Sequence, residues 1–143
     1  MSTYESKSTE QTLQLGRAIG AKVKPGDVIS LDGDLGAGKT VLTRGIAEGM
    51  GLSSEDVMSP TFAIVNEYIS DGHTPLFHFD TYRLSGADDF LACGLDEYFG
   101  RDGVCVIEWG NVIEDILPKG TIRIVITGVG DERKIEMEGM ELC

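Results

Sequence analysis

The chain has 143 residues, 41% of them hydrophobic, and carries 24 acidic against 12 basic side chains, for a formal net charge of −12. This length predicts a single domain over residues 1–143. Because affinity for nucleic acids depends largely on Lys and Arg that neutralise phosphates, the charge argues against direct binding of RNA or DNA and favours a basic protein partner. The sequence has no apolar run long enough to cross a bilayer and no N-terminal signal pattern, which predicts a cytoplasmic protein without membrane contact.

The first elements of the chain are predicted by capping and periodicity. Ser8 followed by Gln11 resembles a capping box and predicts a helix that ends near Lys22. An apolar run predicts a buried strand over 28–31. Apolar residues at helical spacing after position 40 predict a second helix that ends around 49–51.

The middle of the chain predicts two strands joined by a turn. Strands over 62–68 and 76–79 flank a turn at 70–73, and the second strand ends at Asp80. These strands could pair as a hairpin, so the sheet is expected to be mixed.

The last third adds helices and the remaining strands. Ser85 occupies an N-cap position before a predicted helix. The most apolar strand covers 104–107, and a short helix closed by Pro118 precedes two expected edge strands at 121–127 and 133–137. The order predicts an α/β fold of the P-loop NTPase type, with three layers, a mixed but mainly parallel central sheet, and an antiparallel hairpin or edge.

Cysteine usage predicts reduced thiols. Cys93, Cys105 and Cys143 lie far apart and form no C-x-x-C pair for zinc or redox chemistry. Cys105 falls in the apolar strand and is expected in the core.

The segment between the first strand and the second helix fits G-x-x-x-x-G-K-[ST]. It consists of Gly33, Asp34, Leu35, Gly36, Ala37, Gly38, Lys39 and Thr40. Such a loop turns successive backbone N–H groups towards phosphates, while Lys39 reaches the β- and γ-phosphates and the Thr40 hydroxyl can ligate Mg²⁺. The pattern predicts binding of a nucleoside triphosphate, and the lack of an N-K-x-D string favours ATP by elimination.

Two carboxylates follow apolar strands and are candidates for binding Mg²⁺ and for activating the attacking water. Asp80 ends one strand and Glu108 ends another, and ligands of open α/β sheets bind at the carboxyl ends of strands. One acid would seat Mg²⁺ and the other would position or deprotonate the attacking water, but the sequence leaves open which does which. Taken singly, each could also be a surface acid at a strand end.

Three hydroxyl residues are further candidates. Thr43 lies three residues past Thr40 on the same helix face, close to the expected phosphates. Ser59 and Thr61 flank Pro60 where switch loops lie in other P-loop proteins, and a hydroxyl there could sense the γ-phosphate. An ordinary Ser-Pro-Thr turn is an equal alternative.

Four other side chains have open or no roles. Arg83 could be an additional cation facing phosphate, or a salt-bridge partner on an acidic surface. Trp109 could stack near the nucleotide, belong to a partner surface, or lie at the edge of the core. No role follows from sequence for His73 or His78.

Several segments in this order resemble the TsaE family, the small bacterial ATPases required for making threonylcarbamoyladenosine in tRNA. The segments are 33–40 with Thr43-Arg44-Gly45, then Ser59-Pro60-Thr61-Phe62, His78-Phe79-Asp80-Thr81-Tyr82-Arg83-Leu84 and Glu108-Trp109. The first segment is common to P-loop proteins, whereas the other three in combination are typical of this family.

The resemblance implies a function and a set of roles. Members bind ATP and Mg²⁺, hydrolyse ATP slowly, and act with TsaB and TsaD, which modifies adenosine 37 of tRNAs that read codons beginning with A. The ATPase is thought to reset that complex between turnovers, and it meets tRNA only through the complex. By analogy, Lys39 and Thr40 hold phosphates and Mg²⁺, Asp80 seats the metal, Glu108 supports hydrolysis, and Thr43 and Trp109 line the site.

Two other classes of protein remain. A small-molecule kinase needs a lid with several arginines, and the scarcity of cations after Lys39 argues against it. A nucleotide-gated binding module would use ATP only to set its affinity for a partner.

Overall fold

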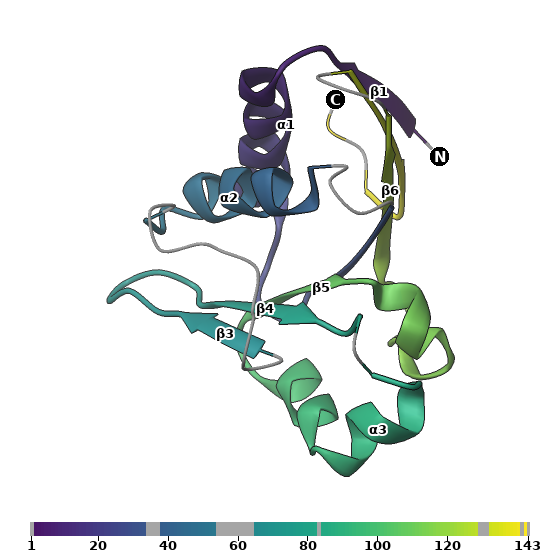
Figure 1. Cartoon of the computed structure of the whole chain (residues 1–143). Helices are drawn as coiled ribbons and strands as arrows, with labels where there is room; N and C mark the ends of the chain where they lie inside the picture. The colour runs from purple at the N-terminus through teal and green to yellow at the C-terminus, as the bar shows by residue number, and fades with distance from the viewer. Residues whose placement is uncertain are drawn as a thin grey trace.

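The computed structural model describes residues 2–33, 38–53, 65–82, 84–128, 132–140 and 142. Within these ranges a seven-stranded sheet has the order β1-β7-β6-β2-β5-β4-β3 (Figure 1). The strands are β1 (Ser2–Ser6), β2 (Val28–Gly33), β3 (Val65–Tyr68), β4 (Leu76–Asp80), β5 (Val104–Glu108), β6 (Ile122–Thr127) and β7 (Arg133–Glu138). The helices are α1 (Thr9–Lys22), α2 (Lys39–Gly49) and α3 (Ala87–Ala92), with the 3₁₀ helices η1 (Leu95–Gly100) and η2 (Gly110–Ile116).

The centre of the sheet is parallel and its margins are antiparallel. Strands β6, β2, β5 and β4 run parallel to one another. At one margin β3 pairs antiparallel with β4, and at the other β7 pairs antiparallel with both β6 and β1. The expected mixed sheet and the β3–β4 hairpin are therefore confirmed. Positions 62–64 of the predicted strand 62–68 lie outside the described residues.

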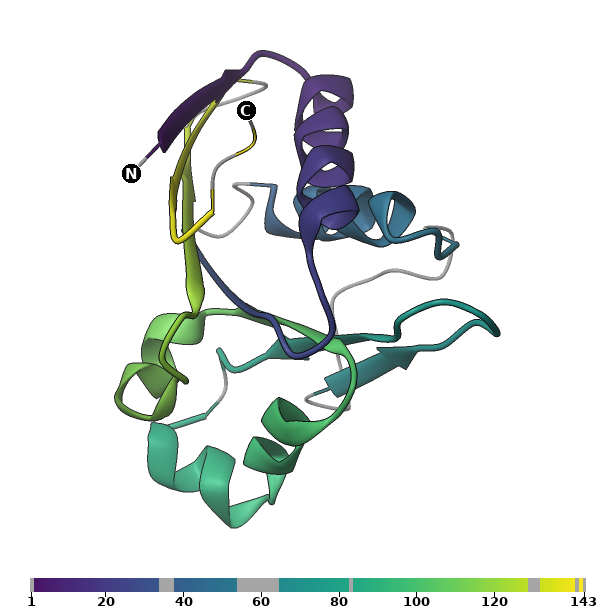
Figure 2. The same ribbon diagram turned by 180° about the vertical axis from the view of Figure 1, so that it is seen from behind.

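Helical segments cover both faces of the sheet and complete three layers. Helices α1 and α2 lie on one face, and α3, η1 and η2 lie on the other (Figures 1 and 2). Alternate residues of β2, β4 and β5 point into two separate hydrophobic clusters, one under each layer. The three-layer α/β arrangement agrees with the predicted fold class.

The predicted edge strands are not edges. Strand β6 lies between β2 and β7, and β7 lies between β6 and β1. The edge on this side is β1, whose short sequence Ser-Thr-Tyr-Glu-Ser has almost no apolar signal of its own. Its pairing depends on β7, a partner from the far end of the chain, and this explains why local pattern missed it.

The predicted helix caps have different outcomes. At α1 the Gln11 amide donates to Ser8 Oγ at 3.1 Å, which confirms the cap. The predicted N-cap of α3 is wrong, because Gly86 occupies that position. The Ser85 hydroxyl donates instead to Asp89 Oδ2 at 2.5 Å, and the Ser85 amide donates to the same oxygen at 2.9 Å. The 3₁₀ helix η1 was not expected.

Helices α1 and α2 approach so closely that only glycine fits where they cross. Gly16 and Gly20 of α1 face Gly45 and Gly49 of α2. A Cβ atom on Gly45 would lie 2.5 Å from the carbonyl oxygen of Leu13 and 2.8 Å from the Cα of Gly16. This contact fixes the position of α2, the helix that begins at Lys39.

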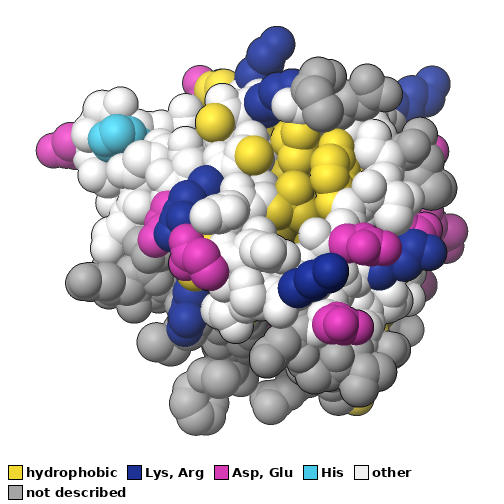
Figure 3. Space-filling view, turned by 90° about the horizontal axis from the view of Figure 1, so that it is seen from above, with side chains coloured by type: hydrophobic (Ala, Val, Ile, Leu, Met, Phe, Trp, Pro, Cys, Tyr) yellow, Lys and Arg dark blue, Asp and Glu magenta, His cyan; other side chains and the backbone are white. Residues whose placement is uncertain are grey.

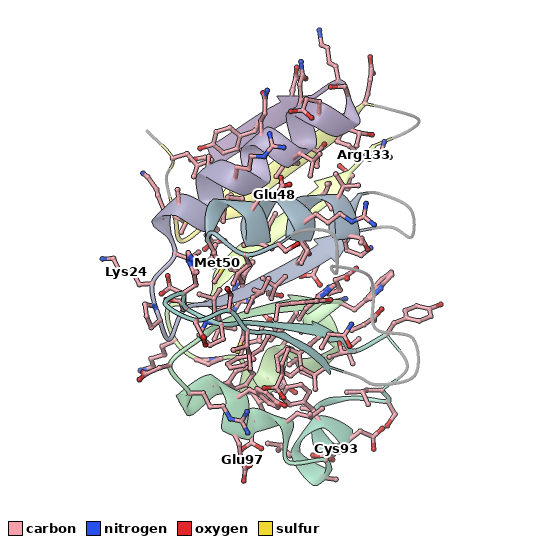
Figure 4. All side chains as sticks on the ribbon, turned by 90° about the vertical axis from the view of Figure 1, so that its left-hand side faces the viewer. Lys24, Glu48, Met50, Cys93, Glu97 and Arg133 are labelled. Atoms are coloured by element: carbon pink, nitrogen blue, oxygen red, sulfur yellow. The ribbon has the colours of Figure 1, made fainter. Side chains whose placement is uncertain are left out.

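An ion pair links the same two helices. Arg17 Nε of α1 donates to Glu48 Oε1 of α2 at 2.8 Å, and Figure 4 labels Glu48 on α2. Arg17 also pairs with Glu10 of its own helix at 3.1 Å. These side chains are partly exposed, so the pairs add little stability compared with the glycine contact.

The surface mixes charges of both signs. On the face seen in Figure 3, hydrophobic side chains gather in one central area and are surrounded by Lys or Arg and by Asp or Glu side chains. In the part of the chain that the structure describes, no helix is both long and apolar enough to cross a membrane.

Candidate functional site

Lys39 lies at the start of α2 and points back towards the end of β2. It follows Gly38, whose φ of 100° is in the left-handed region. Lys39 is 5% exposed, and its Nζ donates to the carbonyl oxygen of Gly33 at 2.9 Å. The ammonium therefore sits between the last residue of β2 and the first turn of a helix, where N–H groups and the helix dipole favour anions.

The two threonines of α2 differ in what their hydroxyls can do. Thr40 is partly exposed in the first turn. Thr43 is fully buried, and its hydroxyl donates to the carbonyl oxygen of Lys39 at 2.9 Å. Thr43 is thus close to the site, as expected, but its hydroxyl is engaged with the backbone of Lys39.

Asp80 and Glu108 are brought together by the register of β4 and β5. They are direct partners in the parallel pairing of these strands, so both side chains lie on the face that α2 covers. Asp80 is partly exposed, whereas Glu108 is 3% exposed.

The environment of Asp80 disfavours its charge. Burial raises the pKa of Asp80, and the neighbouring Glu108 acts in the same direction. The Tyr82 amide, which donates to Asp80 Oδ1 at 3.0 Å, opposes this effect, as does the positive charge of Lys39. A cation close to Asp80 would favour its ionised form.

His78 belongs to this group of side chains, although no role followed from its sequence. It is fully buried, and its Nε2 lies 2.5 Å from Glu108 Oε2. His78 is two residues before Asp80, so strand alternation places both on the same face. That spacing was visible in the sequence, but the contact with Glu108 follows only from the pairing of β4 with β5.

Trp109 has a backbone conformation that is rare for a bulky residue. Its φ of 63° and ψ of 39° are in the left-handed region, where it is the one described non-glycine residue with positive φ. Its amide donates to the Leu31 carbonyl at 2.9 Å, and the Thr81 hydroxyl donates to the Trp109 carbonyl at 2.7 Å. Bonds on both sides of the residue hold a conformation that costs about 1–3 kcal/mol.

The Trp109 ring lies beside the side chain of Lys39 and is not part of the hydrophobic core. Lys39 Nζ is 4.4 Å from the centroid of the indole. The Tyr82 ring, which is 54% exposed, lies 4.9 Å from the same indole by centroids. Trp109 and Tyr82 thus form an aromatic wall beside Lys39.

Several predicted site residues cannot be placed. Asp34, Leu35, Gly36, Ala37, Ser59, Thr61 and Arg83 lie outside the described residues. Those that are placed converge at one end of the parallel sheet, namely Gly33, Gly38, Lys39, Thr40, Thr43, Asp80, Glu108 and Trp109.

The donor set fits a metal ion that is shared with a ligand. Among the described residues, no group of three or more His, Cys, Asp and Glu side chains could hold a metal by itself. Mg²⁺ commonly takes one or two carboxylates and completes its shell with phosphate oxygens and water. The Asp80 carboxylate and the Thr40 hydroxyl are oxygen donors that could serve as the protein ligands in such an arrangement.

The fold and the site define a class of protein. A central parallel strand leads into the glycine-rich loop and helix, and adjacent strands end in carboxylates that face this helix. This is the fold of a P-loop NTPase. The family model described as "Threonylcarbamoyl adenosine biosynthesis protein TsaE" matches residues 6–135, and the chain belongs to this family.

Individual relatives agree with the family. A tRNA threonylcarbamoyladenosine biosynthesis protein TsaE from Bacillus subtilis is 46% identical over 131 residues, which cover 92% of this chain and 80% of the relative. The protein of the same name from Treponema pallidum is 38% identical over 126 residues, or 88% of this chain and 91% of the relative. The crystal structure of Bacillus subtilis YdiB is similar with a TM-score of 0.75 and 41% identity, covering 94% of this chain and 82% of that one. The family assigns the chain to the biosynthesis of threonylcarbamoyladenosine in tRNA.

Proposed function

We propose that this chain binds ATP with Mg²⁺, hydrolyses it slowly, and thereby resets a complex with TsaB and TsaD in the cytoplasm. That complex would form the threonylcarbamoyl group on adenosine 37 of tRNAs reading codons beginning with A. One observation carries the proposal: Asp80 and Glu108 are register partners on the face covered by α2, the helix that begins at Lys39.

In this proposal, Lys39 and the first turn of α2 bind the phosphates. The ammonium would exchange its hydrogen bond with the Gly33 carbonyl for phosphate oxygens. The indole of Trp109, already 4.4 Å from Nζ, would limit the positions open to the lysine side chain. Asp80 and Thr40 would hold Mg²⁺, which neutralises charge on the phosphates when bound.

Glu108 would support hydrolysis, and its surroundings distinguish it from Asp80. Its carboxylate is 3% exposed and hydrogen-bonded to His78, whereas Asp80 is more open. A fixed and desolvated carboxylate suits a group that orients a water molecule or accepts its proton. The more accessible Asp80 suits the metal.

The charge of the chain supports an indirect relation to tRNA. With 12 basic against 24 acidic residues, the chain is poorly suited to neutralise a phosphate backbone. Contact with tRNA would therefore be made by its protein partners.

The test compares two variants in ATP binding, ATP hydrolysis and tRNA modification with TsaB and TsaD present. Lys39→Ala should lose ATP binding, since the lysine supplies the charge at the phosphates. Glu108→Gln should bind ATP normally and lose hydrolysis by about 10²–10⁴-fold. It should also fail in multiple-turnover modification.

Two results would contradict the proposal in different ways. Unchanged ATP affinity of Lys39→Ala would remove the phosphate-binding role. Full modification activity of Glu108→Gln, with hydrolysis lost, would show instead that the chain is a nucleotide-gated binding module.

A further inference from the structure

His78 and Glu108 form a buried pair at the centre of the site. Their side chains are 0% and 4% exposed, and His78 Nε2 is 2.5 Å from Glu108 Oε2. The proposed function uses Glu108 and gives no task to His78. The imidazole is nevertheless a buried polar partner of the Glu108 carboxylate.

The pairing of the strands explains how the contact arises. His78 is opposite Val106 and Asp80 is opposite Glu108, so the imidazole reaches diagonally, by one strand period, to the carboxylate. The backbone of Glu108 is also fixed, because the amide of Thr81 donates to its carbonyl oxygen at 3.2 Å. Thr81 therefore holds the main chain of Glu108, and His78 holds its side chain.

The second ring nitrogen indicates which way the hydrogen bond runs. Among the described residues, Nδ1 of His78 has no hydrogen-bond partner although it is buried. A buried N–H group without a partner is rarer than an unsatisfied acceptor, so the proton is assigned to Nε2. Nε2 then donates to Oε2 of Glu108, and Oε1 is the oxygen that the carboxylate can offer to water.

We propose that His78 is a positioning residue, which holds the Glu108 carboxylate in one orientation for ATP hydrolysis and does so through Nε2 alone. The proposal rests on the proposed role of Glu108. A positioning role requires a hydrogen-bond donor at Nε2. A histidine that only fills space in the core would need the volume of the ring but no donor at that position. Tyr68, whose ring centroid is 6.4 Å away, is its nearest aromatic neighbour among the described pairs.

Two amide substitutions test which of the two ring nitrogens of His78 matters for hydrolysis. In His78→Gln the side-chain amide nitrogen can take the place of Nε2 and donate to Glu108. In His78→Asn the amide nitrogen lies close to the position of Nδ1, for which the described residues provide no hydrogen-bond partner. We expect His78→Asn to lower kcat for ATP hydrolysis by about 10- to 100-fold, as is typical when a supporting hydrogen bond is lost. His78→Gln should stay within about threefold of the parent kcat.

ATP affinity is the readout that a merely structural role would move. Both variants should keep the Kd for ATP within about threefold, measured through the fluorescence of Trp109, the only tryptophan. A loss of affinity equal to the loss of kcat in His78→Asn, or equal losses of kcat in both variants, would overturn the proposal.

A double variant tests whether His78 acts through Glu108. His78→Asn should cause no further loss in the residual hydrolysis of Glu108→Gln, because the group it positions is already changed. If Glu108→Gln alone leaves hydrolysis intact, the proposed function fails. If Glu108→Gln abolishes hydrolysis while His78→Asn has no effect, only the role of His78 fails.

A measurement on the unaltered chain covers the case in which the variants do not fold. Nitrogen-15 NMR of the imidazole should show the proton of His78 on Nε2 and an unprotonated Nδ1. Protonation of Nδ1 with a bare Nε2 would mean that Nε2 does not donate to Glu108, and would refute the mechanism.

Discussion

Substituting Gly45 by Ala tests whether the position of α2 depends on its close contact with α1. Gly45 lies within α2, and an added Cβ would meet only backbone of α1. The atoms are the Leu13 carbonyl oxygen at 2.5 Å, the Gly16 Cα at 2.8 Å and the Arg17 amide nitrogen at 3.2 Å. Backbone cannot rotate away as a side chain can, so the helices must separate.

The size of the effect follows from this displacement. Ordinary contact begins near 3.4 Å, so the 2.5 Å approach requires a shift of about 1 Å. Overpacking of this kind costs about 1–3 kcal/mol, and the better helix propensity of Ala returns up to about 1 kcal/mol. We expect the free energy of unfolding to fall by about 1–2 kcal/mol, and Tm by about 2–8 °C for a chain of this size.

Thermal and urea unfolding of the variant measure this loss, and Ala18→Gly is the matched control. Ala18 is exposed on α1, so its replacement should cost only the propensity difference of about 1 kcal/mol. If helix propensity alone decided the outcome, Gly45→Ala would raise the free energy of unfolding and Ala18→Gly would lower it. If close packing decides the outcome at Gly45, both substitutions lower the free energy of unfolding. A Gly45→Ala variant as stable as the parent, or more stable, would refute the reasoning.

Two further predictions concern ionisable groups. Because burial raises the pKa of Asp80, the folded chain binds its proton more tightly than the unfolded chain, and stability is lost as Asp80 ionises with rising pH. Asp80→Asn should therefore raise the urea midpoint at pH 7, with a gain that shrinks towards pH about 4; a lower midpoint at pH 7 would contradict this. Burial also raises the pKa of the Cys105 thiol to about 12, whereas Cys93 is exposed. In a Cys143→Ser background, iodoacetamide at pH 8 should label Cys93 alone in the native protein, and labelling of Cys105 before unfolding, detected by mass spectrometry, would show that its strand opens.

Local pattern predicted those parts of the fold that depend on neighbours in sequence. The cap at Ser8, the apolar strands β2 and β5, and the helix after the glycine-rich loop all have signals within a few residues. The two strand-end carboxylates were found in the same way, because a run of apolar residues ends directly before each of them.

Features that depend on distant pairing were missed. The contact of His78 with Glu108 requires the register between β4 and β5, which no local pattern contains. The G-x-x-x-G spacings at 16–20 and 45–49 can be read in the sequence, but their meaning requires that the two helices cross there. The left-handed conformation of Trp109 has no sequence signal, because bulky residues rarely adopt it.

The pairing of β1 with β7 has a consequence for the order in which the chain folds during synthesis. Ser2 is opposite Met137, so β1 cannot find its partner until β7, which follows every other strand described here, has left the ribosome. Helices α1 and α2 can pack on each other much earlier, because both lie within the first 49 residues. Between these events the apolar side of the helix pair lacks part of the sheet that will cover it, and such intermediates are prone to aggregation. The nascent chain is therefore expected to be most prone to aggregation while β5, β6 and β7 are still being made, before these three strands have joined the sheet.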